Sequence, residues 1–366
     1  MNEVAALPEF WHEPWPADGL ESVPHCPVCG DVRRELLYAD LVDNVFRVAP
    51  GKWQLWRCTG CRSAYLDPRP TQGSIHIAYS SYFTHTAPLP SPQAAYETLS
   101  AFRKLRRRLH NGYTNRRYST RAQPASAFGI LAAYAVLAKK RGVDSRYRHL
   151  PPLPRDGGKL LDVGCGSGAF LRLAQSCGWE VAGVDPDPKA AASGQGFPVY
   201  QGGLEYFGGQ SELFDVITLS HVIEHVHNPI DTLRHCNTLL KTGGQLWLQT
   251  PNIDSFGYAY FGRNWVGLDP PRHLVLFNLA SLYGALWQAG FHEVRLCTVP
   301  NPIEWIVNAG NAIQAQSANG QGIRSSLRQR LFLAKARIVQ ALFPSRREFL
   351  TVAAHKSGAR PGRTAT

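Results

Sequence analysis

The chain has 366 residues, which is enough for one large domain and a smaller one. Its formal net charge is +12, and the excess is local, because residues 101–155 hold 14 Lys or Arg against one Asp. Such a segment indicates contact with something anionic, such as a phosphate-bearing substrate, a membrane or RNA; a solvated helical face is the alternative. The N-terminus lacks the pattern of a secretion signal, and the longest apolar stretch, residues 128–138, is too short to cross a bilayer. We therefore expect a cytoplasmic protein.

Two C-x-x-C pairs follow an extended N-terminal stretch that is rich in Pro and Trp. The cysteines of these pairs are Cys26, Cys29, Cys58 and Cys61. Two such pairs can complete a shell of four thiolates around one tetrahedral ion, and strand-like runs lie between them, as a zinc ribbon needs. A redox role is the weaker alternative, because no thioredoxin-like context surrounds either pair. The sequence predicts a structural zinc site.

A basic helical segment links the cysteine pairs to the rest of the chain. Residues 92–150 have the pattern of two helices around a turn, and the second helix has an apolar face between basic clusters. We favour packing of this face on the chain's own core. The same pattern suits an interfacial helix on an anionic membrane, so peripheral membrane contact is a hypothesis.

The stretch K-L-L-D-V-G-C-G-S-G-A-F, residues 159–170, has the pattern of a buried strand, a glycine turn and a helix. Gly164, Gly166 and Gly168 allow backbone angles that side chains forbid, and they allow a ligand to approach bare main chain. The spacing G-x-G-x-G differs from the dinucleotide fingerprint G-x-G-x-x-G. The helix that follows directs its unpaired amides towards the same place, so the stretch predicts a polar ligand.

Two acidic residues flank this turn. Asp162 lies in the first strand, and Asp185 ends a second strand 21 residues after Gly164, where a carboxylate can accept both hydroxyls of a ribose. Here the chain resembles the class I S-adenosylmethionine (SAM) dependent methyltransferases, whose first motif looks like L-L-D-V-G-C-G-S-G. The resemblance implies the following cofactor-binding residues: Asp162, Gly164, Cys165, Gly166, Gly168, Asp185, Pro186, Gly203, Leu204, Ser220 and His221.

A buried strand over residues 214–219 delivers the run S-H-V-I-E-H-V to the same edge of the sheet. Methyl transfer to a hydroxyl or carbon acid needs a base, and His is suited to that role. The E-H-V pattern resembles ubiquinone-pathway O-methyltransferases and zinc-containing sugar methyltransferases, which implies His225 as the base with Glu224 as its orienting partner. His273 is the alternative base, and capping of the turn is the structural alternative. The N/D-P-P-Y/F tetrapeptide of adenine and cytosine amino methyltransferases is missing here.

A long aromatic loop follows the next strand, over residues 250–274. Its Trp265 could stack on a substrate ring, and its Arg272 could hold an anionic group. The run from the cysteine pairs into an aromatic helix resembles a bacterial subgroup of methyltransferases with an N-terminal zinc-binding domain. In that subgroup the aromatic segment lies near the SAM pocket, which implies a substrate contact for Tyr82; core packing is the simpler interpretation for it and for Tyr79.

The alternation of strands and helices predicts an α/β fold: a Rossmann-like, mostly parallel sheet with an antiparallel last strand, an N-terminal zinc ribbon and helical additions. We divide the chain as follows: lead-in and ribbon 1–70, basic helical connection 71–152, methyltransferase core 153–300, basic helical insertion 301–347, last strand 348–357 and a disordered tail 358–366.

The sequence thus predicts an enzyme that transfers methyl from SAM to an oxygen or carbon of a small molecule, with a sugar, glycan or polyprenyl-type acceptor. An RNA methyltransferase is the alternative, because a zinc ribbon and local positive charge suit RNA. A non-catalytic SAM-binding scaffold is the second alternative.

Overall fold

The computed structural model describes residues 12–79, 96–135, 137–193, 196–300, 302–317 and 327–357. Tyr82 and the tail 358–366, for which the sequence predicts a substrate contact and disorder, lie outside these residues.

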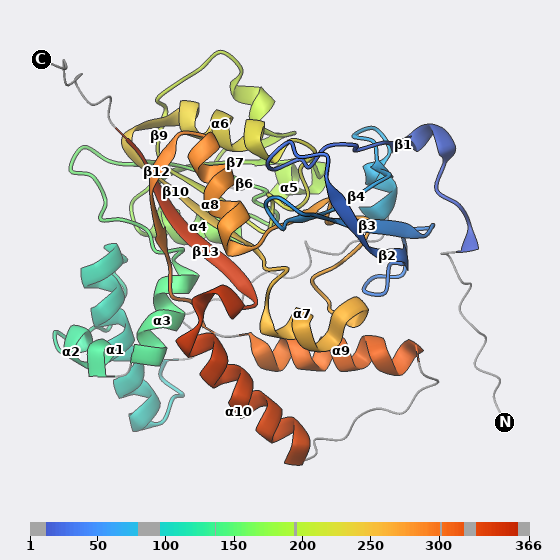
Figure 1. Ribbon diagram of the computed structural model, residues 1–366. Helices are drawn as coiled ribbons and strands as arrows, with labels where there is room; N and C mark the ends of the chain where they lie inside the picture. Colours follow the sequence, from blue (N-terminus) through green and yellow to red (C-terminus); the bar gives the residue numbers. More distant parts are fainter. Residues whose placement is uncertain are drawn as a thin grey trace, which may run out of the picture.

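One sheet of seven strands forms the centre of the molecule (Figure 1). Its strands are β6 (Lys159–Val163), β7 (Glu180–Asp185), β8 (Val199–Gln201), β9 (Phe214–Ser220), β10 (Leu240–Pro251), β12 (Phe291–Leu296) and β13 (Phe349–Lys356). The spatial order is β12-β13-β10-β9-β6-β7-β8, and β13 runs antiparallel to both of its neighbours. The predicted fold class is confirmed. The order reverses between β6 and β9, which is where ligands bind in open parallel sheets.

The two faces of the sheet bury different cores, because successive strand residues point to opposite sides. Leu161 and Ile217 belong to a large core, whereas Leu160 and Val216 belong to a smaller one. Four helices that alternate with the strands complete the α/β layers: α4 (Ala169–Ser176), α5 (Pro188–Ser193), α6 (Pro229–Leu239) and α8 (Leu279–Gln288).

The basic segment forms α1 (Ala101–Tyr118), α2 (Gly129–Ala135) and α3 (Leu137–Arg146); α2 and α3 are separated only by residue 136, which lies outside the described residues. Tyr113, Tyr118 and Tyr147 bury their rings in the smaller core, beside Leu160 of the sheet. One face of this helical unit is therefore packed on the methyltransferase sheet, but Phe128 and Leu131, from the apolar stretch that was predicted to pack, are exposed. Within the described residues, no helix is both long enough and apolar enough to cross a membrane.

The cysteine pairs lie at a second sheet, to which the N-terminal region contributes three strands and the methyltransferase region contributes one. Its strands are β2 (Arg34–Leu41), β3 (Trp53–Cys58), β4 (Ala64–Leu66) and β11 (Val275–Leu276), in the order β11-β4-β3-β2. Strand β11 follows the aromatic loop of the methyltransferase region, more than 200 residues after β4. A small ribbon, β1 (Leu20–Glu21) with β5 (Arg69–Pro70), and the short helices η2 (Ala17–Gly19) and η3 (Ile75–Tyr79) complete the N-terminal region.

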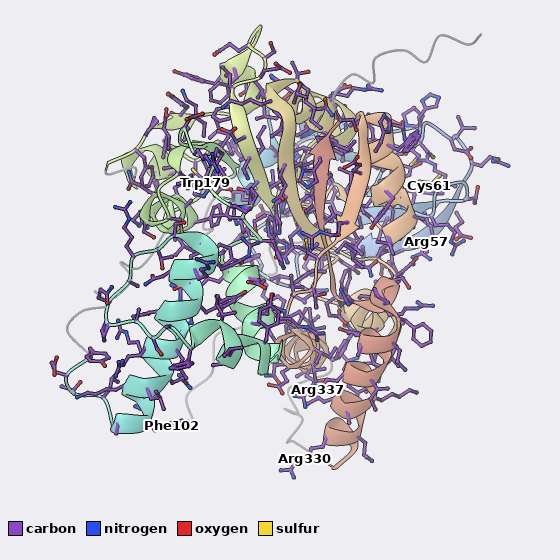
Figure 2. All side chains as sticks on the ribbon, turned by 90° about the vertical axis from the view of Figure 1, so that its left-hand side faces the viewer. Arg57, Cys61, Phe102, Trp179, Arg330 and Arg337 are labelled. Atoms are coloured by element: carbon purple, nitrogen blue, oxygen red, sulfur yellow. The ribbon has the colours of Figure 1, made fainter. Side chains whose placement is uncertain are left out.

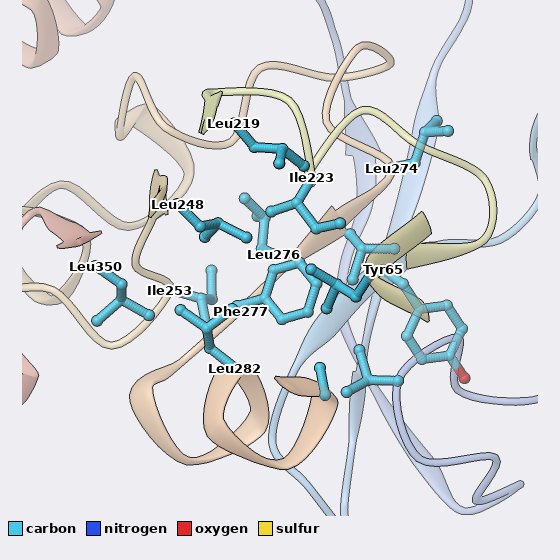
Figure 3. Close-up of a cluster of buried hydrophobic side chains, with 14 of the residues drawn as sticks. Tyr65, Leu219, Ile223, Leu248, Ile253, Leu274, Leu276, Phe277, Leu282 and Leu350 are labelled. Atoms are coloured by element: carbon cyan, nitrogen blue, oxygen red, sulfur yellow. The ribbon is translucent and has the colours of Figure 1, made fainter. Parts of the chain in front are cut away.

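The large core runs without interruption from the N-terminal sheet into the methyltransferase sheet (Figure 3). Tyr65 of β4 lies in the same cluster as Leu219, Ile223 and Phe277, and all four side chains are fully buried. The boundary drawn at residue 70 is therefore not a boundary between separate hydrophobic cores.

The segment between β12 and β13 contains two long helices, α9 (Ile303–Ser317) and α10 (Leu327–Leu342), and the short η6 (Pro344–Arg346). These helices pack on α7 (Phe256–Phe261), which follows β10 and precedes η5 (Gly262–Asn264). Phe332 of α10 contacts the rings of Phe256 and Tyr260. The insertion thus covers part of the loop that follows β10.

Candidate functional site

The glycine turn after β6 has the conformation that its glycines allow. Gly164, Gly166 and Gly168 have φ of 68°, 51° and 68°, in the left-handed region. A Cβ on Gly164 would lie 2.5 Å from a methyl carbon of Val222, and one on Gly168 would lie 3.0 Å from the ring of Phe197. Helix α4 begins after Gly168 with no side-chain cap, so its first amides are open to a polar ligand.

Asp185, at the end of β7, holds the turn in place. One carboxylate oxygen accepts from the amide of Gly166 at 2.8 Å, and the other accepts from the amide of Asp187 at 2.9 Å. A carboxylate has about four acceptor positions, so both oxygens can still accept ribose hydroxyls. The geometry therefore suits the role predicted for this residue.

Asp162 is different, because its carboxylate is turned away from solvent. The residue is fully buried, and one carboxylate oxygen accepts from Arg148 and from the hydroxyl of Thr218, the latter at 2.8 Å. Burial raises the pKa of Asp162, and the nearby Arg148 opposes this effect. The guanidinium of Arg148 also lies over the ring of Phe170, 3.9 Å from its centroid. Asp162 is thus a partner of Arg148 and Thr218, while its second carboxylate oxygen has no hydrogen-bond partner among the described residues, and its direct contact with the cofactor stays a prediction.

The other predicted cofactor residues lie around the same edge of the sheet. Cys165 is buried behind the turn, Pro186 is exposed after β7, and Ser220 ends β9. Gly203 donates its amide to Glu205 at 2.6 Å, and the side chain of Leu204 packs in the large core. Only main chain of these two residues is left to line an adenine, and their roles stay predictions.

The segment after β9 builds the chemical part of the site around a buried carboxylate. Glu224 is fully buried and accepts from His221 Nδ1 at 3.2 Å and from the hydroxyl of Thr250 at 3.0 Å. Burial alone would raise the pKa of Glu224, but the hydrogen bond from His221 and the charges of nearby histidines outweigh it and lower the pKa to about 2. Its carbonyl accepts from the amides of Leu274 and Val275, which ties this turn to β11.

His225 and His273 lie side by side next to this carboxylate, with ring centroids 4.7 Å apart. His225 Nδ1 lies 2.9 Å from the carbonyl of Arg272, and His273 Nδ1 lies 2.8 Å from the carbonyl of Gly267. Since a carbonyl only accepts, both Nδ1 atoms carry hydrogen, and the Nε2 of a neutral His225 keeps its lone pair. Burial and the neighbouring His273 lower the pKa of His225 to about 4, so its imidazole is neutral at pH 7.

Glu224, His225 and His273 offer one ligand atom each, and these atoms lie within 4.8 Å of one another. Two imidazole lone pairs and a carboxylate can accept a proton from a substrate or bind a divalent cation. The prediction that Glu224 orients His225 is wrong: Glu224 binds His221 and Thr250, and the carbonyl of Arg272 orients His225.

Tyr79 is a site residue that sequence reasoning undervalued. Its hydroxyl lies 3.1 Å from His225 Nδ1, although Tyr79 belongs to η3 of the N-terminal region. Arg69 of β5, in the same region, donates to the carbonyl of His227 at 2.9 Å. The N-terminal region therefore contacts the segment after β9 directly. An aromatic cluster after the second cysteine pair was the available signal, but it did not indicate a partner.

Arg272 does not have the substrate role predicted for it. Its guanidinium is fully buried and donates to the carboxylates of Asp43 and Asp269 and, at 2.9 Å, to the carbonyl of Ala78. Burial alone would lower its pKa, but the two carboxylates raise it above the usual range. With its donors engaged, Arg272 cannot bind a substrate anion; it links the N-terminal region to the loop that orients His225.

Trp265 also departs from its predicted substrate role. The side chain is 2% exposed, its ring contacts Tyr258 at a centroid distance of 5.6 Å, and it packs over Gly267. Neither ring face is open to a ligand, so the stacking prediction is wrong.

The four paired cysteines converge at one point of the N-terminal sheet. Sγ of Cys26 lies 3.6 Å from that of Cys61, and Sγ of Cys29 lies 3.5 Å from that of Cys58; all four sulfurs lie within 4.8 Å of one another. Tetrahedral zinc with bonds of about 2.3 Å would place its sulfurs about 3.8 Å apart, so the donor set fits zinc. None of the four is in a disulfide.

Comparisons with known proteins agree with this geometry. A family model described as "Methyltransferase domain" matches residues 138–296. The ubiquinone biosynthesis O-methyltransferase of Cereibacter sphaeroides is 33% identical over 169 residues, which cover 42% of this chain and 68% of that protein. The enzyme of the same name from Aromatoleum aromaticum is 28% identical over 171 residues, with coverage of 42% and 73%.

Solved structures are more distant. A SAM-dependent methyltransferase from Archaeoglobus fulgidus is 21% identical, with a TM-score of 0.40, over 61% of this chain and 99% of that chain.

The reversal of strand order, the antiparallel β13 and the glycine turn define a class I methyltransferase fold. The chain belongs to the SAM-dependent methyltransferases, as its sequence predicts, and is therefore an enzyme of that class. The turn fits this cofactor, because its left-handed glycines leave the main chain bare, the first amides of α4 are open, and the carboxylate of Asp185 is bound to the turn through the amide of Gly166.

Proposed function

We propose that the enzyme methylates a hydroxyl oxygen of a small molecule and that His225 removes the hydroxyl proton. The observation that carries the proposal is the fixed tautomer of His225, whose Nδ1–H donates to the carbonyl of Arg272 and whose Nε2 keeps its lone pair. SAM supplies an electrophilic methyl group when it is bound. The protein positions the acceptor and receives its proton on Nε2, which leaves an imidazolium beside the Glu224 carboxylate.

Glu224 suits this role electrostatically. Its depressed pKa keeps it ionised at neutral pH, and its negative charge stabilises a positive charge that develops on His225. The Nδ1 of the neighbouring His273 lies 2.8 Å from the carbonyl of Gly267, which fixes the position of this ring beside His225.

A polyprenyl-type acceptor with a free hydroxyl is the first class to test, because two relatives are named for ubiquinone biosynthesis. Sugar and glycan acceptors come second. Purified enzyme with SAM labelled in its methyl group should transfer label to a hydroxylated polyprenyl acceptor, and product NMR should show an O–CH₃ group. Transfer to a carbon, or to RNA alone, would contradict the proposal.

We also propose that Cys26, Cys29, Cys58 and Cys61 bind one structural zinc ion. The support is the convergence of four sulfurs without a disulfide at distances that suit a tetrahedral ion. Four thiolates leave no open coordination position, so this ion would hold the N-terminal sheet rather than take part in methyl transfer.

A further inference from the structure

The basic helical unit contains a cavity that the methyltransferase reaction does not use. The cavity lies between α1, α2 and α3 and has a volume of about 930 Å³, which is within the size range of small-molecule sites. Its lining includes five cationic side chains, and none of its described lining residues is acidic. The cations are Arg103, Arg106, Arg107, Lys140 and Arg146. These residues define the basic pocket.

The walls of the basic pocket are held close together by glycines. A Cβ on Gly112 of α1 would lie 1.8 Å from the carbonyl oxygen of Ser126, and one on Gly129 of α2 would lie 2.4 Å from that of Leu109. Any side chain at either position would force the two backbones apart. The pocket is therefore part of the packed fold and not a gap between loosely placed helices.

Three of the five cationic side chains of the pocket have no carboxylate partner within the described residues. Asp144 is the carboxylate beside it, and this group already accepts from the hydroxyls of Tyr113 and Tyr118 at 2.6 and 2.7 Å and from Lys140 at 2.7 Å. In the described part of the chain, Arg103, Arg106 and Arg146 have no ion-pair partner. Burial lowers the pKa of His110 in the lining, and the charges of Arg146, Arg107 and Arg106 add to that effect.

Several apolar side chains of the same helical unit, outside the lining of the pocket, are exposed to solvent. Phe102 and Leu105 of α1 are 73% and 52% exposed. Phe128, just before α2, and Leu131, within α2, are each 70% exposed. Figure 2 shows Phe102 at the outer end of α1, away from the sheet. Inside the pocket, Leu99, Leu109 and Val143 add apolar surface. A pocket lined by cationic and apolar side chains is complementary to a ligand that has an anionic head and an apolar body.

We propose that the basic pocket binds the phosphate or diphosphate head of an amphiphilic ligand. Two sources could supply this head: a phospholipid of an anionic membrane, into which the exposed apolar side chains of α1 and α2 would insert, or a phosphorylated molecule that diffuses in solution. Both share the same recognition chemistry, in which guanidinium groups bind phosphate oxygens.

The test compares two triple variants with the same net charge. The pocket variant is Arg103→Gln/Arg106→Gln/Arg146→Gln, which changes solvent-accessible side chains of the pocket. The control variant is Arg108→Gln/Arg116→Gln/Arg234→Gln, which changes exposed arginines outside the pocket. Circular dichroism and thermal unfolding would establish that both variants keep the wild-type fold.

Two binding measurements then distinguish the sources: sedimentation with vesicles of phosphatidylglycerol and phosphatidylcholine, and calorimetry with inorganic pyrophosphate. If the ligand is a membrane lipid, wild type and the control variant sediment with anionic vesicles and the pocket variant binds about a hundredfold more weakly. The Phe128→Ser/Leu131→Ser variant then also loses vesicle binding but keeps pyrophosphate binding. If the ligand is a soluble molecule, wild type and the control variant bind pyrophosphate but not vesicles, and only the pocket variant loses affinity for pyrophosphate.

The proposal would be overturned if wild-type protein bound neither vesicles nor pyrophosphate at low salt. It would also be overturned if the control variant lost as much affinity as the pocket variant, because binding would then follow net charge and not the pocket. Binding of RNA without binding of either phosphate probe would assign the positive charge to a nucleic acid and would likewise overturn it.

Discussion

At the scale of single residues, the site depends on which nitrogen of His225 carries hydrogen. The carbonyl of Arg272 fixes that choice, and the carbonyl is in turn held by a guanidinium that donates to Asp43 and Asp269. Arg272 is therefore a positioning residue, and it acts on the reaction through His225.

The lowered pKa of His225 has a consequence for the pH dependence of the reaction. An imidazole with a pKa of about 4 is neutral, and thus able to accept a proton, throughout the range from about pH 5.5 to 8. We expect kcat/KM to be flat over this range for an acceptor that does not ionise in it, and to fall only as the pH approaches 4. A fall in kcat/KM with decreasing pH that is centred near pH 6.5, the ordinary pKa of His, would contradict the lowered pKa of His225.

Replacement of Arg272 tests its buried ion pairs. Arg272→Ala leaves the carboxylates of Asp43 and Asp269 buried without their partner, so we expect unfolding free energy to fall by about 3–5 kcal/mol in urea titrations. Arg263→Ala is a suitable control, because it removes an exposed ion pair with Asp40 and should cost less than about 1 kcal/mol. Equal effects of the two substitutions would be inconsistent with the structure.

At the scale of elements, the sequence indicated those features that are set by residues close together in the chain. The glycine turn was predictable because a strand, three glycines and a helix follow one another within a dozen residues, and the cysteine pairs were predictable from their spacing. The pairing of β4 with β11 was not, because β11 has only two residues and its partner is more than 200 residues away. A two-residue strand carries no detectable periodicity.

The same limit explains the errors at the site. Arg272 has a carboxylate partner 229 residues earlier in the chain, and Arg148 reaches Thr218, 70 residues later. In a single sequence, a buried arginine in a structural ion pair is indistinguishable from one that awaits a substrate anion. Trp265 was misassigned for the same reason: an aromatic residue in a long loop suits a lid and a core equally well.

The zinc site makes a prediction at the scale of one element. Purified protein should contain about one zinc ion per chain by mass spectrometry, and Cys58→Ser should lose the metal and lower the melting temperature. Cys177→Ser is the control, since Cys177 is buried outside the cluster and its loss should leave zinc content unchanged. If wild-type protein stripped of metal had the same melting temperature as untreated protein, the thiols would hold no structural ion.

At the scale of the whole molecule, the N-terminal region and the methyltransferase sheet behave as one folded body. They share a four-stranded sheet, a continuous core and the ion pairs of Arg272, and they meet at the segment after β9. The N-terminal region therefore forms one wall of the site, through Tyr79 and Arg69, in addition to holding the cysteine cluster.

Truncation tests this integration. A fragment that begins at residue 96 lacks β4 and Asp43, so β11 loses its strand partner and Arg272 loses one of its two carboxylates. We expect the fragment to unfold without a cooperative transition, or to precipitate, although it retains every strand of the large sheet. A fragment with a sharp transition at the wild-type melting temperature would show that the two parts fold independently.

The central claim is that His225 accepts the proton of a hydroxyl that becomes methylated. The most direct measurement is the turnover of His225→Ala with labelled SAM and a hydroxylated acceptor, together with the dissociation constant of SAM by calorimetry. We predict that kcat falls by about a hundredfold or more while the SAM dissociation constant changes less than about threefold, because the glycine turn and Asp185 are untouched. Wild-type turnover in His225→Ala, with SAM still bound, would contradict the account.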